Sequence, residues 1–120
     1  MISVARHRMA VERFYTDRAA IYRHGKVKDP ITKETKLIPQ VVYEDQPCRI
    51  SQSGLAKNNQ TEAQNDISYE TKLFIAPELE LKQGDLLEVT RGGITRKYTA
   101  GEPFPYPSHQ EVSIQREEWA

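Results

Sequence analysis

The sequence predicts a mainly β fold, a small β-barrel or sandwich with a short N-terminal helix and a long polar loop. Three observations support this fold class. Residues Ile67 to Ile75 alternate between apolar and polar side chains, the pattern of a half-buried strand. Arg91-Gly92-Gly93 separates two β-rich runs, as in a tight hairpin. Several short strands in one small chain favour a closed sheet, because closure removes exposed strand edges.

Length and composition narrow the class of protein. The chain has 120 residues, which predicts one domain over residues 1–120, since domains most often contain about 100–150 residues. Basic and acidic residues balance at 17 each, so the whole chain lacks the basic excess typical of nucleic-acid-binding proteins. The single cysteine excludes an intrachain disulfide and fits a reducing, intracellular setting. Without a signal peptide or an apolar run near ~20 residues, we expect a soluble protein with no membrane partner.

The first quarter of the chain predicts a helix and a strand. Ile2 to Phe14 lacks Gly and Pro and is expected to be helical. Residues 19–23 alternate like a strand, and His24-Gly25 is expected to end it. Lys26 to Lys36 is charged and contains an Asp-Pro pair, which is typical of a hairpin connection.

The next strand is predicted to be interrupted by proline. Residues 37–43 are rich in β-branched and aromatic side chains, and Pro39 restricts this part to a strand start or an edge. Gln46-Pro47 is expected to mark a bulge or bend, after which the strand resumes over Cys48 to Ile50.

A polar segment, Ser51 to Asp66, carries Leu55 as its only large apolar residue. It is predicted to be a long loop, and loops of this length in compact domains are functional or disordered. A passive, mobile excursion remains the alternative. The residues of the predicted loop are Ser51, Gln52, Ser53, Gly54, Leu55, Ala56, Lys57, Asn58, Asn59, Gln60, Thr61, Glu62, Ala63, Gln64, Asn65 and Asp66.

The second half of the chain predicts a turn, a hairpin and a last strand. Gln83-Gly84-Asp85 is a turn signature before the hairpin strands Leu86 to Thr90 and Ile94 to Thr99. Glu102 to Pro107 contains three prolines, which cannot donate to a ladder, so we expect an extended crossing loop there. Val112 to Arg116 is the predicted final strand.

No catalytic or metal-binding signature stands out. His7, His24 and His109 lack a ligand-like spacing, so we expect no metal and no cofactor. Cys48 follows a proline in a strand and is best explained as a small buried apolar residue, because the sequence identifies no base to activate it. We therefore expect a protein that is not an enzyme.

Basic residues stand beside aromatic ones at Arg13-Phe14-Tyr15, Tyr22-Arg23 and Arg96-Lys97-Tyr98. Such side chains can stack on single-stranded nucleic acid, as in oligonucleotide-binding barrels. Aromatic residues in strands more often fill a core, and that interpretation is favoured here.

The two ends of the chain carry opposite charge. Met1 to Lys28 contains seven basic residues and two acidic ones, whereas Ala100 to Ala120 contains four acidic residues and one basic one. Opposite charges of this kind can pair within one molecule or between neighbouring copies. The candidate subunit contacts are Arg6, Arg8, Arg13, Glu117 and Glu118.

The order of these elements resembles a known protein family. The pattern comprises Arg18 to Arg23, Cys48 to Ser51 before the polar loop, Thr71 to Ile75, Leu81 to Val89 and the final strand. It is similar to the small head-closure, or head-completion, proteins of long-tailed phages and phage-like prophages of the PBSX type. The N-terminal helix and the proline-rich segment have no counterpart in that pattern.

The resemblance implies a structural head-tail connector. It implies a β-barrel subunit that is monomeric when isolated and joins a ring in the particle neck, between a portal-adaptor protein and a tail-joining protein. The loop of residues 51–66 would project into the channel and hold packaged double-stranded DNA. Assembly would take place in the host cytoplasm. A tail-side joining or terminator protein and a single-stranded nucleic-acid-binding barrel remain the alternatives.

Overall fold

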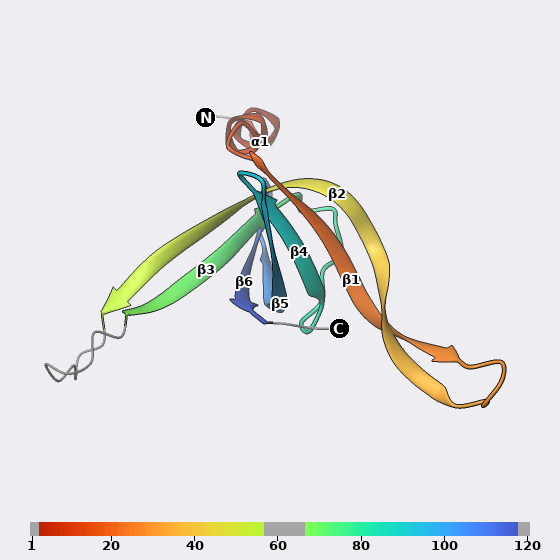
Figure 1. Ribbon diagram of the computed structural model, residues 1–120. Helices are drawn as coiled ribbons and strands as arrows, with labels where there is room; N and C mark the ends of the chain where they lie inside the picture. Colours follow the sequence, from red (N-terminus) through yellow and green to blue (C-terminus); the bar gives the residue numbers. More distant parts are fainter. Residues whose placement is uncertain (1–2, 57–66, 118–120) are drawn as a thin grey trace, which may run out of the picture.

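Six antiparallel strands pair in the cyclic order β1-β2-β3-β6-β5-β4, and β4 returns to pair with β1 (Figure 1). The computed structural model describes residues 3–56 and 67–117, with the side chains of residues 54–56 and 67–69 not described. The elements are α1 Val4–Glu12, β1 Asp17–Lys28, β2 Thr35–Ala56, β3 Ile67–Ile75, β4 Leu86–Arg91, β5 Ile94–Pro105 and β6 Gln110–Arg116. The predicted mainly β class with a short N-terminal helix is confirmed, and the pairing closes into a barrel.

Alternate residues of all six strands fill the barrel. The predicted alternation of β3 is confirmed at Leu73 and Ile75, which are fully buried. Burying a side chain of this size contributes about 1.5–3 kcal/mol, so this shared interior is the main source of stability. The core comprises Ala19, Ile21, Cys48, Leu73, Ile75, Leu81, Leu87, Val89, Tyr98, Ala100, Val112 and Ile114.

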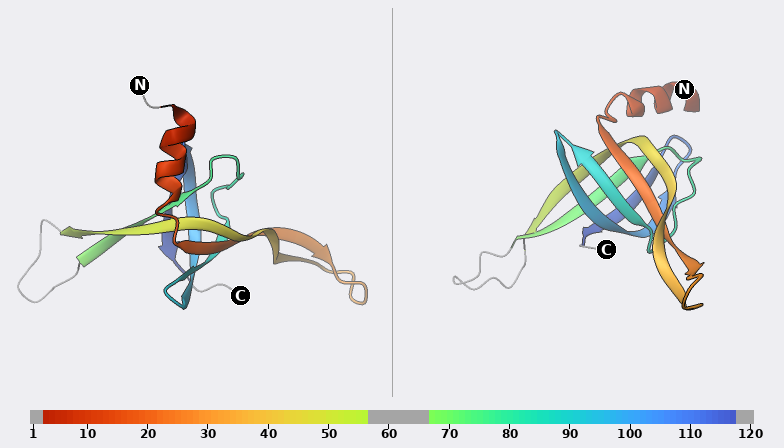
Figure 2. Two further views of the ribbon diagram at one scale, coloured as in Figure 1. Left: turned by 90° about the horizontal axis from the view of Figure 1, so that it is seen from above. Right: turned by 45° about the vertical axis from the view of Figure 1, so that its right-hand side comes forward.

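Two pairs of strands continue beyond the barrel as two-stranded ribbons. β1 pairs with β4 only over Arg18–Tyr22, so the rest of β1 pairs with β2 alone. We call this part the β1–β2 ribbon. β3 pairs with β6 only from Thr71 onwards, so Ser53–Ala56 of β2 pairs with Ile67–Glu70 alone and forms the β2–β3 ribbon. The two ribbons extend on opposite sides of the barrel (Figure 2).

The first two strands are longer than predicted. β1 runs through His24-Gly25 to Lys28, so the expected break there is wrong, and the hairpin connection is shorter than Lys26 to Lys36. Gly25 fits inside the strand because a Cβ atom there would lie 2.2 Å from Oε1 of Gln40. The glycine makes room for the Gln40 side chain, which lies diagonally across on β2, opposite Arg23, and the strand continues past it.

β2 is one strand that contains both of its prolines. Pro39 and Pro47 pair with residues of β1, so neither of them divides the strand. The expected bulge is present slightly earlier in the chain. The register changes from Ala19 opposite Gln46 to Ile21 opposite Tyr43, and Asp45 has a φ of 48°. This bulge lies opposite Ala20, in the part of β1 that also pairs with β4 and so belongs to the barrel.

The proline-rich segment is largely part of β5. β5 extends to Pro105 and pairs with β6 after a register change between Ala100 and Pro103, so the expected crossing loop over residues 102–105 is wrong. Pairing with β4 ends at Thr99. The prolines therefore lie where β5 has one strand neighbour, and their missing N–H groups do not interrupt a central ladder.

The predicted turns and helix are confirmed. Gly92 and Gly93 connect β4 to β5 with φ values of 57° and 81°, which a primed two-residue turn requires. Ser3 caps α1 by accepting the Arg6 N–H at 3.2 Å, yet no residue of the helix itself is buried. The helix is held instead by Arg8, which forms ion pairs with Glu12 of α1 and with Glu78 after β3.

Candidate functional site

The predicted polar loop begins later than the sequence suggests. Ser51–Ala56 belongs to β2, with Ser51 opposite Lys72 and Ala56 opposite Ile67, so the expectation of an irregular segment is wrong for these six residues. A two-stranded ribbon outside the barrel needs backbone pairing but no apolar face, and this is why polar residues form it. Lys57–Asp66 lies outside the described residues.

The β2–β3 ribbon ends outside the barrel. Its two strands finish opposite each other at Ala56 and Ile67, the residues that flank Lys57–Asp66 in the sequence. Gln52 and Ser53 at its base are exposed. The described part of the predicted loop is therefore a paired ribbon.

The structure separates the predicted subunit contacts by their surroundings. Arg8 pairs with Glu12, Nε to Oε1 at 2.8 Å, and with Glu78, so it holds α1 within its own chain. Arg6 and Arg13 are exposed and have no ion-pair partner among the described residues. The Glu117 carboxylate accepts a hydrogen bond from the Thr99 hydroxyl. Glu118 lies outside the described residues.

The β1–β2 ribbon carries exposed apolar side chains. Leu37 and Val41 lie on one face of β2 with 64% and 48% of their surfaces exposed, and Ile38 on the other face is 42% exposed. An exposed apolar patch on a protruding element is typical of a protein interface. Sequence reasoning missed this surface because it placed part of the ribbon in a loop.

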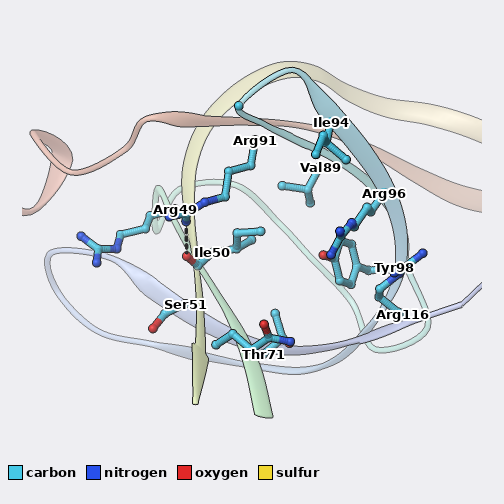
Figure 3. Close-up of a pocket in the computed structure, with 12 residues that line it drawn as sticks. Arg49, Ile50, Ser51, Thr71, Val89, Arg91, Ile94, Arg96, Tyr98 and Arg116 are labelled. Atoms are coloured by element: carbon cyan, nitrogen blue, oxygen red, sulfur yellow. Dashed lines mark hydrogen bonds between the residues drawn. The ribbon is translucent and has the colours of Figure 1, made fainter. Parts of the chain in front are cut away.

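One end of the barrel opens into a cavity of about 640 Å³ with an arginine-rich rim (Figure 3). On three neighbouring strands, core residues point into the barrel. Two residues further towards this end, the inward-facing side chain of each of these strands is an arginine. These residues are Arg91 on β4, Arg96 on β5 and Arg116 on β6. Arg96 pairs with Val89 across the sheet and Arg116 with Tyr98, which places both arginines on the interior face. We call this end the barrel mouth.

Arg91 is anchored at the mouth. Its Nη1 donates to the Ile50 carbonyl at 3.0 Å and lies 3.5 Å from Oδ2 of Asp17. Asp17 is buried, and the same oxygen accepts the Ile50 N–H at 2.9 Å. The carboxylate therefore satisfies a backbone donor and only partly balances the nearest guanidinium.

The other arginines at the cavity differ in their surroundings. Arg96 and Arg116 are exposed and have no ion-pair partner among the described residues. Arg49 extends away from the other labelled side chains, and its guanidinium lies over the Phe14 ring at 5.4 Å from the centroid (Figure 3). Beside the anchored Arg91, the mouth thus holds two guanidinium groups that no described residue pairs.

The aromatic side chains considered for stacking on nucleic acid differ in their surroundings. Tyr98 is 3% exposed and belongs to the core, which confirms the preferred interpretation for this residue. Arg23 is held by Asp85 at 2.8 Å. Phe14 is exposed, but Arg49 lies over its ring.

The Cys48 thiol and the possible metal ligands were the other candidates for chemistry. Cys48 is fully buried, as expected, and this burial raises the pKa of its thiol to about 12. Within residues 3–56 and 67–117, no group of three or more His, Cys, Asp or Glu side chains is arranged to hold a metal ion. The helix in this part of the chain falls short of the length and apolarity that crossing a bilayer requires.

The arginine cluster escaped sequence reasoning because its members are far apart in the chain. Arg96 and Arg116 come together only through the pairing of β5 with β6. One signal was available: each arginine stands two residues from a core residue of its strand, after Val89 and Ile114 and before Tyr98, which places it on the inward face.

Comparisons with known proteins give a family and a related fold. Residues 7–104 match a family described as "Family of unknown function (DUF6093)". No curated protein matches the chain. Among solved structures, the fold is similar to that of the phage-like element PBSX protein xkdH from Bacillus subtilis, with 15% sequence identity and a TM-score of 0.50. The similarity covers 83% of this chain and 92% of that chain.

Proposed function

The chain belongs to the family of unknown function DUF6093, and from this family, its fold and its two ribbons we propose that it is a structural protein of a phage or phage-like particle. More specifically, we propose a head-tail connector of the head-closure type with no enzymatic role. It would join a ring in the particle neck, between a portal-adaptor protein and a tail-joining protein. The similarity to the PBSX protein over most of both chains is the observation that carries this proposal.

The β2–β3 ribbon supports a channel-facing role for one side of the subunit. In a ring, each such ribbon would bring Lys57–Asp66 towards the channel. Its amide side chains can hydrogen-bond to neighbouring copies, and Lys57 can contact DNA phosphate. Glu62 and Asp66 would limit that attraction, so that packaged double-stranded DNA is stopped and later released.

The β1–β2 ribbon supports contact with a neighbouring subunit. A two-stranded ribbon is marginally stable alone in water, and here it exposes Leu37 and Val41. Successive subunits in a ring meet through different, complementary surfaces. We propose that this apolar face packs against the next copy, and that Arg6 and Arg13 add an electrostatic contact.

Electron microscopy of particles assembled without this protein tests the proposal. Heads that lack tails and have lost their DNA are the expected result for a head-closure protein. Heads that retain DNA beside separate, complete tails would assign the protein to the tail side of the junction. Tailed particles that retain their DNA would reject the connector function.

A further inference from the structure

We propose that the barrel mouth binds the phosphate backbone of nucleic acid. The mouth brings Arg91, Arg96 and Arg116 together from three neighbouring strands around one cavity. Its volume of about 640 Å³ is ample for a phosphodiester group and falls within the usual range of ligand sites. A guanidinium fork matches the geometry of phosphate oxygens and binds them through two parallel hydrogen bonds.

The charge balance of the mouth favours an anionic ligand. Among the described residues, none that lines the cavity is acidic, and Asp17 beneath it accepts the Ile50 N–H and lies 3.5 Å from Arg91 alone of the three arginines. Arg96 and Arg116 have no ion-pair partner in the described part of the chain. The chain has no net charge, so this positive potential is local and arises from the fold.

The floor of the cavity favours a backbone contact over recognition of bases. Tyr98 is 3% exposed and Val89 is 1% exposed, so neither ring nor methyl groups are available to stack on a base. An inserted protein segment would bury one exposed apolar side chain of the lining, Ile94, but would leave the arginine charges without a partner. Phosphate contacts satisfy those charges directly. The expected binding is therefore independent of nucleotide sequence.

This inference goes beyond the proposed connector function, because it concerns a site within one subunit. Binding by the isolated chain requires neither a ring nor a particle. A failure of DNA binding and a failure of particle assembly are therefore separate results.

Fluorescence anisotropy with a labelled 12-base-pair duplex and its single strand tests the proposal. The unmodified chain is titrated between about 25 and 200 mM salt, where each phosphate contact contributes about 0.9 to the slope of log K against log salt. Arg96→Gln with Arg116→Gln removes the two unpaired guanidinium groups. We expect this double variant to bind about tenfold more weakly at low salt and to lose about 2 units of slope.

The matched control is Arg6→Gln with Arg13→Gln, which removes the same charge from an exposed position on α1 and from its exposed C-cap. It is expected to keep the affinity and slope of the unmodified chain. Equal losses of DNA affinity in the two double variants would overturn the assignment of the binding site to the barrel mouth, because such losses would reflect net charge alone. Unchanged binding by the Arg96 and Arg116 variant would also overturn it.

Two further measurements identify the source of the anion. NMR of the arginine Nε–H groups in the unmodified chain is expected to show shifts at Arg91, Arg96 and Arg116 on adding duplex, independently of any variant. Tighter binding of an eight-residue polyglutamate peptide would overturn the assignment to nucleic acid. Inorganic phosphate alone producing the same shifts at a lower phosphate concentration than the duplex would overturn it as well.

Discussion

Arg23 on β1 and Asp85 before β4 form a two-pronged ion pair, with Nε to Oδ1 at 2.8 Å and Nη2 to Oδ2 at 2.9 Å. Asp85 is buried and also accepts the Lys82 N–H at 2.8 Å, while Arg23 also donates to the Glu80 carbonyl. The hydrogen bonds to Asp85 raise the pKa of Arg23 above its ordinary value. The pair ties the residue where β1 leaves the barrel to the turn that precedes β4.

Removing this pair is expected to destabilise the fold. Arg23→Met leaves Asp85 as a buried carboxylate without its cation, which costs about 3–5 kcal/mol for a fully buried pair. The Arg23 side chain is 31% exposed, so we expect a loss of about 2–3 kcal/mol. Urea unfolding with an unchanged m value measures it.

The surface pair of Arg18 and Asp45, Nε to Oδ1 at 3.8 Å, provides a control. Arg18→Met is expected to cost less than about 1 kcal/mol, because exposed ion pairs are weak. Equal losses from the two arginine variants would contradict the role assigned to the buried carboxylate.

Stability is expected to fall in alkaline solution. Burial raises the pKa of the Cys48 thiol to about 12 and that of the Tyr15 hydroxyl to about 12. In the unfolded chain these groups ionise near pH 8.5 and pH 10, so above about pH 9 the unfolded chain binds fewer protons than the native one. The stabilisation that each protonated group gives to the native state is fully present below that pH. It is lost as the pH rises towards 12, by up to about 1.4 kcal/mol of unfolding free energy per pH unit for each group.

Cys48→Ala separates the thiol from the other groups. Between pH 8 and 10 the variant is expected to lose most of the pH dependence of its free energy of unfolding, although it is less stable throughout because a buried sulfur is removed. Urea midpoints across this range provide the measurement. An identical pH slope in the variant and the unmodified chain would show that the thiol is not responsible.

Shortening the end of the β2–β3 ribbon tests the channel role. Ala56 and Ile67 are directly opposed, so replacing Lys57–Asp66 by Asn-Gly supplies a two-residue hairpin turn. We expect the free energy of unfolding to change by less than about 1 kcal/mol, since loop length affects closure entropy weakly. Particles carrying the variant should lose DNA before tail attachment, as measured by their packaged DNA content.

A Gly-Ser segment of equal length in place of Lys57–Asp66 is the control for length. Particles that carry this segment are expected to retain less DNA than particles with the unmodified chain, because the segment lacks the amide and lysine side chains. Full, stable heads from the Asn-Gly variant would reject the channel role and show that the segment is a passive connection.

The β1–β2 ribbon is expected to be needed for ring assembly. Leu37→Ser with Val41→Ser removes exposed apolar groups. The free energy of unfolding of the isolated chain should therefore change by no more than about 0.5 kcal/mol. Its incorporation into particles should fall several-fold, measured by quantitative blotting of purified particles. Ile94→Ser, at an exposed apolar position on the β4–β5 hairpin, is the control and should assemble normally. Normal incorporation of the ribbon variant would exclude this face from the subunit contact.

The helix arginines provide a separate test of subunit docking. Arg6→Glu with Arg13→Glu reverses exposed charges that have no ion-pair partner in the described residues, so the monomer should stay folded. We expect reduced incorporation that recovers partly at low salt. Arg8 is left unchanged, because its pairs with Glu12 and Glu78 hold α1 in place. Unaltered incorporation of the Arg6 and Arg13 variant would reject the proposed electrostatic contact between subunits.

Local patterns identified much of the barrel before its structure was known. The alternation in Ile67 to Ile75, the Gly92-Gly93 turn and the final strand all depend on side chains near one another in the chain, so their patterns remain visible in sequence. The lengths of β1 and β2 were missed for the opposite reason. In the ribbons, residues such as Gly25 and Pro39 are held by pairing with a distant strand and need no apolar alternation.

The amino-acid sequence was enough to predict the mainly β class, the short helix and the polar character of Ser51 to Asp66. The strand conformation of Ser51–Ala56 and the cavity shared by Arg91, Arg96 and Arg116 are visible in the folded chain alone. Periodicity tells which face of a strand a residue occupies, but not which strands become neighbours. The three like charges come together because β5 pairs with β4 on one side and with β6 on the other, which aligns the inward-facing arginines at one end of the barrel.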